Sequence, residues 1–180
     1  MTAMNKSTGS TDPRVTREKR EEDLPPERKS GDSSMPPEIR EMREEDLLRV
    51  AQIERQNFSV PWKEQDFRDF IVRDDAIFLT ALWRGEVAGY IGFYGIPDEG
   101  DITNVSVDER FRRRGIGRAL VHELTRRASD RGISTIFLEV RDSNESAIRL
   151  YQEAGFVQVG LRKRYYSSPT EDARIMRYRK

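Results

Sequence analysis

The spacing of apolar and polar residues predicts a series of short strands in the middle of the chain. Three β-rich runs cover residues 77–83, 87–94 and 101–107, and the short segments Arg84-Gly85-Glu86 and Pro97-Asp98-Glu99-Gly100 separate them. Glycine and proline at such short intervals between β-rich runs are typical of hairpin turns. The pattern therefore predicts three consecutive strands joined by hairpins.

Helical periodicity flanks these strands on both sides. Two helices are expected before them, from the acidic segment at 44–46 toward Phe58 and from about 63 to 72, with a break at Pro61-Trp62. After them, apolar residues recur at helical spacing from Ile116 up to Gly132, a residue type suited to end a helix. A shorter helix is expected from 144 to 154, ending at Gly155.

Four further strands are expected outside the central group, at 39–42, 135–140, from Phe156 onward, and at 173–178. The order of elements in the second half is helix, strand, helix and a pair of strands. This order indicates an α/β domain with a mixed sheet.

The first 35 residues have a different composition from the rest. They contain no aromatic residue and few aliphatic ones, and a mixed charge run from Arg17 to Asp23 precedes Pro25-Pro26. Such a segment cannot offset its ordering entropy by burial. We expect a disordered tail over 1–35 and one domain over 36–180, and Met35 could serve as an alternative start.

Charge and residue usage exclude several classes of function. Lysine and arginine total 32 in the 180 residues, as do aspartate and glutamate, so no global field would draw the chain onto nucleic acid or a membrane. Without cysteine and with His122 as the only histidine, thiolate nucleophiles and a histidine zinc site are excluded, and we expect no metal. No apolar run approaches the about 20 residues of a membrane span. The expected location is the cytoplasm, as a monomer or weak dimer.

A basic, glycine-containing loop is the most specific feature of the sequence. The strand ending Val105-Ser106-Val107 leads into Arg112-Arg113-Arg114-Gly115-Ile116-Gly117-Arg118, where a helix begins. Free backbone N–H groups and the positive end of the helix would converge there, and glycine lets a phosphate approach closely. The alternative is a solvated arginine loop before an ordinary helix. A nucleotide P-loop is excluded because no Gly-Lys-Ser/Thr follows.

Three polar residues downstream are candidates for chemistry, and each also has an ordinary structural interpretation. Glu139 lies within an apolar strand, where acids are depleted, although an outward-facing position or a salt bridge would explain it. Tyr151 shares a helical face with Ala147 and Ala154, as a core aromatic residue would. Asn144 is well placed to cap a helix.

The basic loop resembles a motif of a known family. Its sequence is similar to the Gln/Arg-x-x-Gly-x-Gly/Ala pyrophosphate loop of the GNAT N-acetyltransferases. Residues 138–141, Ser143-Asn144, Leu150-Tyr151 and Gly155-Phe156 resemble the second half of those enzymes, especially the RimI-type ribosomal-protein-alanine N-acetyltransferases. The resemblance extends over about 38–180 and leaves the tail without a counterpart.

The resemblance implies a fold, a co-substrate and roles for residues. The fold would be the GNAT fold, a twisted mixed sheet flanked by helices and splayed at its central parallel strands, with acetyl-CoA in the split. Glu139 would act as general base and Tyr151 as general acid. The residues implied to bind the cofactor are Val105, Ser106, Val107, Arg112, Arg113, Arg114, Gly115, Ile116, Gly117, Arg118 and Asn144. Trp62, Tyr165 and Tyr166 would border the peptide groove, unless they are core aromatics.

The resemblance also implies a substrate, the N-terminal alanine of ribosomal protein S18, acetylated by direct attack in a ternary complex. An acyl-enzyme is not expected, because the sequence has no cysteine and no convincing serine triad. Two alternatives stay open. The first is a GNAT enzyme for another amine or for many protein N-termini, and the second is a CoA-binding module without turnover.

Overall fold

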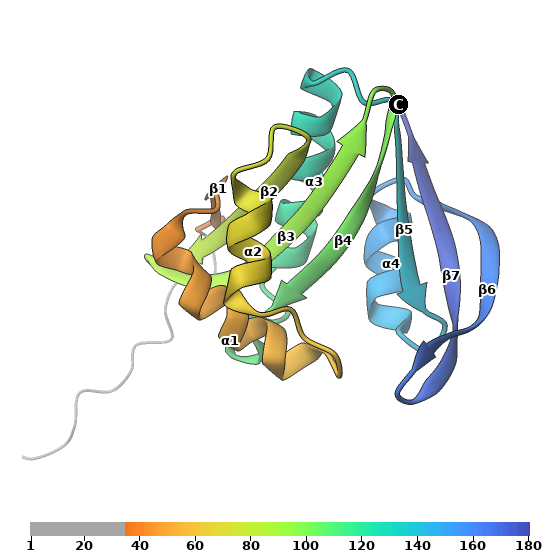
Figure 1. The fold of residues 1–180 in the computed structure, drawn as a ribbon, viewed down its shortest axis with the longest axis horizontal. Coiled ribbons are helices and arrows are strands. Elements are labelled where there is room, and N and C mark those ends of the chain that lie inside the picture. The colour runs from red at the N-terminus through yellow and green to blue at the C-terminus, as the bar shows by residue number, and fades with distance from the viewer. Residues whose placement is uncertain (1–34) are drawn as a thin grey trace, which may run out of the picture. The chain divides into compact units, whose positions relative to one another are not determined.

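A seven-stranded mixed sheet organises residues 35–180, which are the residues that the computed structural model describes (Figure 1). Apart from Met35, the tail predicted for 1–35 lies outside the described residues. The strands, in the spatial order β1-β2-β3-β4-β5-β7-β6, are β1 (Glu38–Glu41), β2 (Ala76–Trp83), β3 (Glu86–Ile96), β4 (Glu99–Val107), β5 (Thr135–Arg141), β7 (Thr170–Arg179) and β6 (Val157–Ser167).

Four α-helices flank the sheet: α1 (Leu47–Asn57), α2 (Glu64–Ile71), α3 (Ile116–Asp130) and α4 (Glu145–Glu153). Two short 3-10 helices, η1 (Glu44–Asp46) and η2 (Glu109–Phe111), precede α1 and α3. The predicted strands and α-helices are all confirmed, and the two predicted hairpins join β2 to β3 and β3 to β4. The second 3-10 helix was not predicted.

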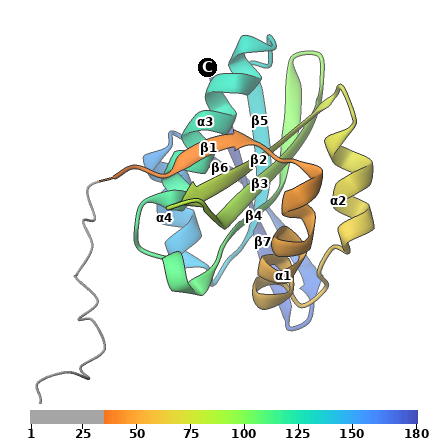
Figure 2. The same ribbon diagram turned by 90° about the vertical axis from the view of Figure 1, so that its left-hand side faces the viewer.

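The helices form two layers, one on each side of the sheet. Figure 2 shows α1 and α2 on one side of strands β1 to β4, and α3 on the other. Phe67 of α2 and Ile53 of α1 are fully buried against the first face, together with Tyr90 of β3. On the opposite face, Leu120 and Leu124 of α3 belong to a larger core that also includes residues of β5 and α4.

The central strands β4 and β5 are parallel but remain paired for only a short distance. Their register covers Glu99–Asp101 of β4 against Thr135–Phe137 of β5. Beyond that point the strands diverge, as Figure 1 shows. The sheet therefore splits between its parallel strands, which confirms the predicted GNAT fold with splayed central strands.

A β-bulge changes the side-chain alternation of β4 at the start of the split. The pairing of β4 with β3 shifts so that Thr103 has no partner between Ile102 and Asn104. Ile102 and Val105, three residues apart, consequently both pack on the core beneath α3. The side chain of Asn104 instead points to the face of α1. The bulge thus places a polar side chain on the α1 side, beside the split.

The described residues contain neither a helix suited to span a membrane nor a cluster of side chains suited to hold a metal ion. Within residues 35–180, no helix is long and apolar enough to cross a membrane. Over the same residues, no group of three or more histidine, cysteine, aspartate or glutamate side chains is arranged to hold a metal ion.

Candidate active site

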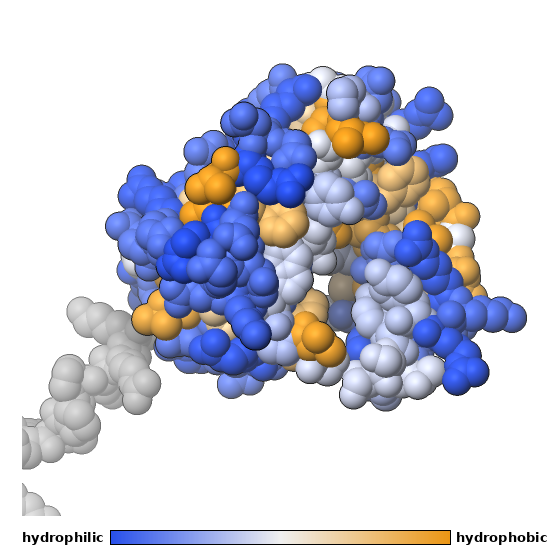
Figure 3. All heavy atoms as spheres, in the orientation of Figure 1, coloured by the Kyte–Doolittle hydropathy of each residue, from blue (hydrophilic) through white to orange (hydrophobic). Residues whose placement is uncertain are grey.

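The split between β4 and β5 opens onto the molecular surface. Figure 3 shows the surface hollowed between the half built on β2 to β4 and the half built on β5 to β7. On one edge, Val105 and Val107 of β4 pair with Ile91 and Gly89 of β3. The other edge of β4 has no partner strand beyond Asp101, so its backbone groups face the split. An unpaired strand edge can bind an extended ligand by backbone hydrogen bonds.

The loop predicted to bind an anion leads directly into the first turn of α3. Gly115 precedes the helix with φ of 77°, in the left-handed region that favours glycine. The N–H of Ala119 donates to the Gly115 carbonyl at 3.0 Å. The N–H groups of Ile116, Gly117 and Arg118 lie in the first turn, where an α-helix supplies no acceptor. These donors and the positive helix end favour an anion.

Close packing places this helix start beside the split. A Cβ atom added to Gly117 would lie 3.1 Å from Cδ1 of Leu150 on α4 and 3.9 Å from a methyl group of Val107 on β4. The first turn of α3 therefore lies between the end of β4 and α4. The absence of a side chain at Gly117 lets α3 and α4 approach each other closely here.

The arginines of the loop contact protein groups, with different partners. Arg112 donates to the side chain of Asn57, and Arg118 pairs with Glu153 of α4. The guanidinium of Arg114 lies 5.3 Å from the centre of the Trp83 ring. In this structure the backbone supplies the convergent donors, and the arginines add positive charge around them.

Glu139 faces away from the core and forms a salt bridge, the two structural explanations that the sequence left open. Its neighbours Leu138 and Val140 are buried in the core, whereas the Glu139 side chain lies on the other face of β5 and is 22% exposed. Nη1 of Arg162, on β6, lies 3.1 Å from its carboxylate. Glu139 therefore forms a salt bridge, and its carboxylate is still accessible from solvent.

Tyr151 is buried on α4, and its ring packs 5.8 Å from that of Phe156. Burial raises the pKa of its hydroxyl above the ordinary range, and the nearby Tyr166 raises it further. The phenol consequently stays protonated at neutral pH and is available as a donor. This environment fits a core aromatic residue and a proton donor equally well.

Tyr166 lies near both candidate catalytic residues. Its hydroxyl lies 3.5 Å from the backbone carbonyl of Glu139, to which it donates. The guanidinium of Arg141 lies 4.1 Å from the centre of its ring. Burial is the main reason that the pKa of Tyr166 is raised to about 12. The fold therefore brings Glu139, Tyr151 and Tyr166 together on the β5 side of the split.

Trp62 and Tyr165 belong to opposite halves of the fold. Trp62 follows α1, and its ring lies 5.3 Å from that of Phe67 and 5.0 Å from that of Phe70. Tyr165 is half exposed near the end of β6 and contacts Tyr166 edge to face. Figure 1 places the α1–α2 connection and the β6–β7 turn on either side of the open end of the split. Trp62 is part of an aromatic cluster as well as a candidate groove residue.

Asn144 acts as the N-cap of α4. Its Oδ1 accepts a hydrogen bond from the Ala147 N–H at 3.1 Å, which is the helix-capping role that the sequence allowed. The cap leaves the amide nitrogen of Asn144 available to another partner.

A buried polar cluster around Glu54 of α1 was not predicted from the sequence. Glu54 of α1 is fully buried, and its carboxylate accepts hydrogen bonds from the Tyr90 hydroxyl, the Trp62 backbone and Nδ2 of Asn104. Burial raises the pKa of Glu54, although all three donors lower it. The available signals were a glutamate among the apolar residues of α1 and an asparagine inside a β-rich run.

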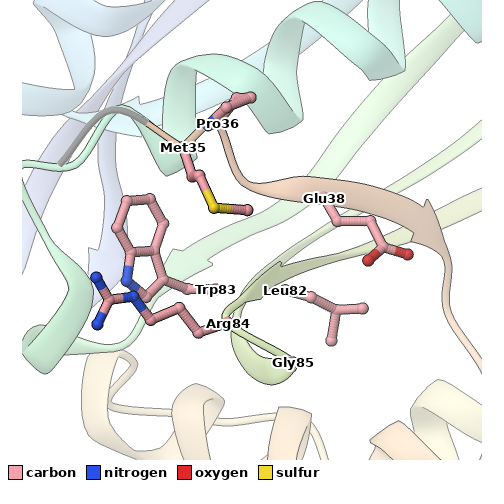
Figure 4. A pocket seen from close by; sticks show the side chains of 7 residues that line it. All are labelled: Met35, Pro36, Glu38, Leu82, Trp83, Arg84 and Gly85. Carbon is pink, nitrogen blue, oxygen red and sulfur yellow. The ribbon is translucent and has the colours of Figure 1, made fainter. Parts of the chain in front are cut away.

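A small pocket elsewhere on the protein contains none of the predicted site residues. Figure 4 shows it between β1 and the β2–β3 turn. It is lined by Met35, Pro36, Glu38, Leu82, Trp83, Arg84 and Gly85. It has no carboxylate–tyrosine pair and no helix N-terminus, so it does not compete with the split as the candidate site.

The geometry fits a ligand that carries a phosphate at one end and an extended arm. The first turn of α3 provides donors for the phosphate, and the free edge of β4 can pair with the arm. These two features adjoin each other at Val107 and Gly117. Coenzyme A has this layout, with a pyrophosphate joined to a pantetheine arm that contains amide groups.

Comparisons with known proteins agree with this geometry. The profile of the Acetyltransferase (GNAT) family matches residues 47–156. The [ribosomal protein bS18]-alanine N-acetyltransferase of Escherichia coli (strain K12) is 34% identical over 129 residues, covering 72% of this chain and 85% of that protein. The N-alpha-acetyltransferase RimI of Mycobacterium tuberculosis is 36% identical over 138 residues, covering 73% and 85%.

Solved structures give the same result. The crystal structure of the ribosomal-protein-S18-alanine N-acetyltransferase from Escherichia coli superposes with a TM-score of 0.73 at 32% identity, covering 79% of this chain and 93% of that one. The structure of Ard1 from Thermoplasma volcanium superposes with a TM-score of 0.72 at 29% identity, covering 79% and 97%. With the family profile covering most of the folded residues and the sheet split at its parallel strands, the chain belongs to the GNAT family of acetyltransferases.

Proposed function

We propose that this protein transfers the acetyl group of acetyl-CoA to the N-terminal α-amine of a protein, with the N-terminal alanine of ribosomal protein S18 as its substrate. The observation that carries the proposal is the position of Glu139, Tyr151 and Tyr166 on one side of the split, opposite the free edge of β4. The relatives named as alanine or N-alpha-acetyltransferases support the choice of amine.

The cofactor would bind across the features described above. The backbone N–H groups from Gly115 to Arg118 would hold its pyrophosphate, surrounded by the charges of Arg112, Arg113 and Arg114. The edge of β4 from Val105 through Ser106 to Val107 would pair with the pantetheine arm. Asn144 would add a side-chain contact from the start of α4. When bound, acetyl-CoA supplies a thioester whose acetyl carbon accepts the amine.

Glu139 would take the proton that the amine must lose. An α-ammonium has a pKa of about 8, so roughly a tenth of it is neutral at pH 7. As the amine nitrogen bonds to the acetyl carbon, its proton passes to the Glu139 carboxylate, directly or through water. Arg162 would hold the carboxylate in place, and the N–H of Val107 would stabilise charge on the thioester oxygen.

Tyr151 would donate its proton as the carbon–sulfur bond breaks. Because burial raises its pKa above about 10, full transfer to a thiolate of pKa about 8.5 is uphill by more than roughly 2 kcal/mol. Tyr151 would therefore first stabilise the departing sulfur by a hydrogen bond and complete the transfer later. Attack would be direct, and no acyl-enzyme is expected, because the sequence has no cysteine and no convincing serine triad.

Initial rates on matched peptides test the choice of substrate. A peptide with the N-terminal sequence of S18 should react far faster than the same peptide with its α-amine blocked and only lysine side chains free. The lysine pKa of about 10.4 leaves roughly two orders of magnitude less neutral amine at pH 7. Equal rates would reject N-terminal specificity, and other N-termini or small amines that react faster would identify a different substrate. No acetyl-CoA consumption with any amine would favour a binding module.

A further inference from the structure

The pairing of β6 with β7 is interrupted close to the proposed peptide groove. It stops after Arg162 and resumes at Tyr166. Residues 163–165 of β6 consequently lie opposite a single residue of β7, Asp172. A bulge of this kind leaves residues outside the hydrogen-bonded ladder and often lies next to an active site. The position of residues 163–171, which we call the β6–β7 wall, therefore depends in part on contacts other than strand pairing.

The guanidinium of Arg141, at the end of β5, holds the β6–β7 wall from the neighbouring strand. Nη2 donates to the carbonyl of Ser168 at 3.0 Å, and Nη1 donates to that of Pro169 at 3.3 Å. Both carbonyls belong to the turn between β6 and β7 (Figure 1). The same guanidinium lies 4.1 Å from the centre of the Tyr166 ring, which is a cation–π contact. One side chain therefore holds the turn and the tyrosine together.

Glu171 fixes the orientation of that guanidinium. Its Oε2 accepts a hydrogen bond from Nη1 of Arg141 at 3.0 Å, and its Oε1 accepts the backbone N–H of Ser143 at 2.7 Å. Hydrogen bonds from Ser143 and Arg141 lower the pKa of Glu171, so its carboxylate is ionised at neutral pH. Because an arginine carries its donors in a rigid planar fork, a carboxylate on one side directs the remaining N–H groups toward the two carbonyls.

The position of Arg141 on β5 relates the β6–β7 wall to the candidate general base. Glu139 and Arg141 are two residues apart in the same strand, so their side chains lie on the same face of β5. Tyr166, whose ring Arg141 contacts, donates to the backbone carbonyl of Glu139 at 3.5 Å. The β6–β7 wall is therefore anchored to the strand that carries the base, through Arg141 and through Tyr166.

We propose that Arg141 is a positioning residue for the peptide substrate: it fixes Tyr166 and the β6–β7 turn relative to Glu139, and the wall so held aligns the peptide behind its reacting amine. The inference rests on the proposed function and adds a residue that sets peptide binding. Arg141 acts through Tyr166 and the turn and touches no reacting atom. Lysine cannot replace it fully, because an ammonium is a point charge without the planar fork that meets a carboxylate, two carbonyls and a ring together.

The test compares Arg141→Met with a matched control, Arg127→Met. The Arg127 side chain is 25% exposed, against 26% for Arg141, and its ion pairs are with Glu123 and Glu41, outside the β6–β7 wall. Initial rates with a peptide that begins with alanine, at saturating acetyl-CoA, give KM and kcat. Arg141→Met should raise the peptide KM about tenfold with a smaller fall in kcat, because a misplaced substrate loses binding and alignment. Arg127→Met should lower the Tm and leave both constants unchanged.

Two further variants and one further measurement separate positioning from stability. Arg141→Lys keeps the charge and should recover part of the peptide KM. Glu171→Gln removes the ionic partner of Arg141 but can still accept the Ser143 N–H, so it should raise the KM by less than Arg141→Met. Hydrogen exchange followed by mass spectrometry reports on the β6–β7 wall without turnover. Exchange there should be faster in Arg141→Met than in the wild type and unchanged in Arg127→Met.

Several outcomes would overturn the inference, and they distinguish it from the proposed function. If the wild type acetylates the peptide and Arg141→Met keeps its KM, the inference alone fails, whatever the exchange rates. Equal rises in KM for Arg141→Met and Arg127→Met would reduce Arg141 to a general structural role. Weaker CoA binding by Arg141→Met in isothermal titration calorimetry would assign the network to the cofactor instead. If the wild type does not acetylate the alanine peptide, the proposed function fails and the inference with it.

Discussion

Two glycines at opposite ends of α3 allow the anion-binding role of its first turn to be tested cleanly. Gly115 precedes the helix with φ of 77°, and Gly132 follows it with φ of 82°. A Cβ added at either position would meet no atom within 4 Å. Substitution by alanine is therefore unfavourable only because of the backbone, and the cost of a left-handed conformation is about 1–2 kcal/mol at both.

The two variants should lose similar stability and differ in their response to CoA. For a folded unit of this size, 1–2 kcal/mol corresponds to a loss of roughly 2–8 °C in Tm. With CoA at 100 times its Kd, ligand binding stabilises the wild type by about 2.7 kcal/mol. If Gly115→Ala shifts the first turn and weakens binding tenfold, about 1.4 kcal/mol remains, because the ligand is then at only about ten times its Kd. Gly132→Ala should keep the full CoA stabilisation of about 2.7 kcal/mol.

Differential scanning fluorimetry across a CoA titration measures the Tm without ligand and the rise in Tm that CoA produces. Both variants carry alanine, so the introduced side chains are identical. The reasoning is refuted if Gly115→Ala and Gly132→Ala retain equal CoA-induced shifts. That result would remove the Gly115 turn from the cofactor site, and the basic loop would be a solvated arginine loop. A Gly115→Asn variant should recover part of the CoA response, since asparagine tolerates the left-handed region.

Three further predictions concern catalysis, the tail and pH. Glu139→Gln and Tyr151→Phe should each lower kcat strongly with little change in CoA affinity, and full activity of both across pH would contradict the mechanism. Removing residues 2–34 should leave Tm and turnover unchanged, because that segment is poor in apolar residues. Hydrogen bonds from Arg126 and Arg127 lower the pKa of Glu123 to about 2, so its stabilisation is present above about pH 4.5 and lost as pH falls toward 2. The difference in urea midpoint between wild type and Glu123→Gln should shrink over that range, and a constant difference would contradict the assignment.

Local sequence signals were sufficient to predict the strands and α-helices of this fold. The β2–β3 and β3–β4 hairpins follow from Gly85 and from the Pro97 to Gly100 turn, and α3 ends where Gly132 adopts a positive φ. The depth of the split could not be predicted in this way, because it depends on how far β4 and β5 stay paired. The two strands are separated along the chain by α3, so the length of their pairing is a long-range property that no local pattern encodes.

The residues of the candidate site that belong to a sequence motif were predictable, whereas the residues brought together by tertiary packing were not. The loop around Gly115 and Gly117 and the strand residue Glu139 were identified from their sequence context. Arg162 was missed because its partnership with Glu139 spans two strands that pair only through β7. Glu54 and Asn104 were missed because their contact joins α1 to β4 across 50 residues.

The missed residues share a physical property with the residues that were found. Glu139 and Asn104 both lie in strands where their residue types are unfavourable, and both lie at the split. Burying Glu54 is costlier still, since desolvation disfavours the charged carboxylate. A fold that needed only stability could replace these groups with apolar side chains of similar volume. The position of Glu139 at the split is explained if the site uses its carboxylate to accept the proton that the amine loses.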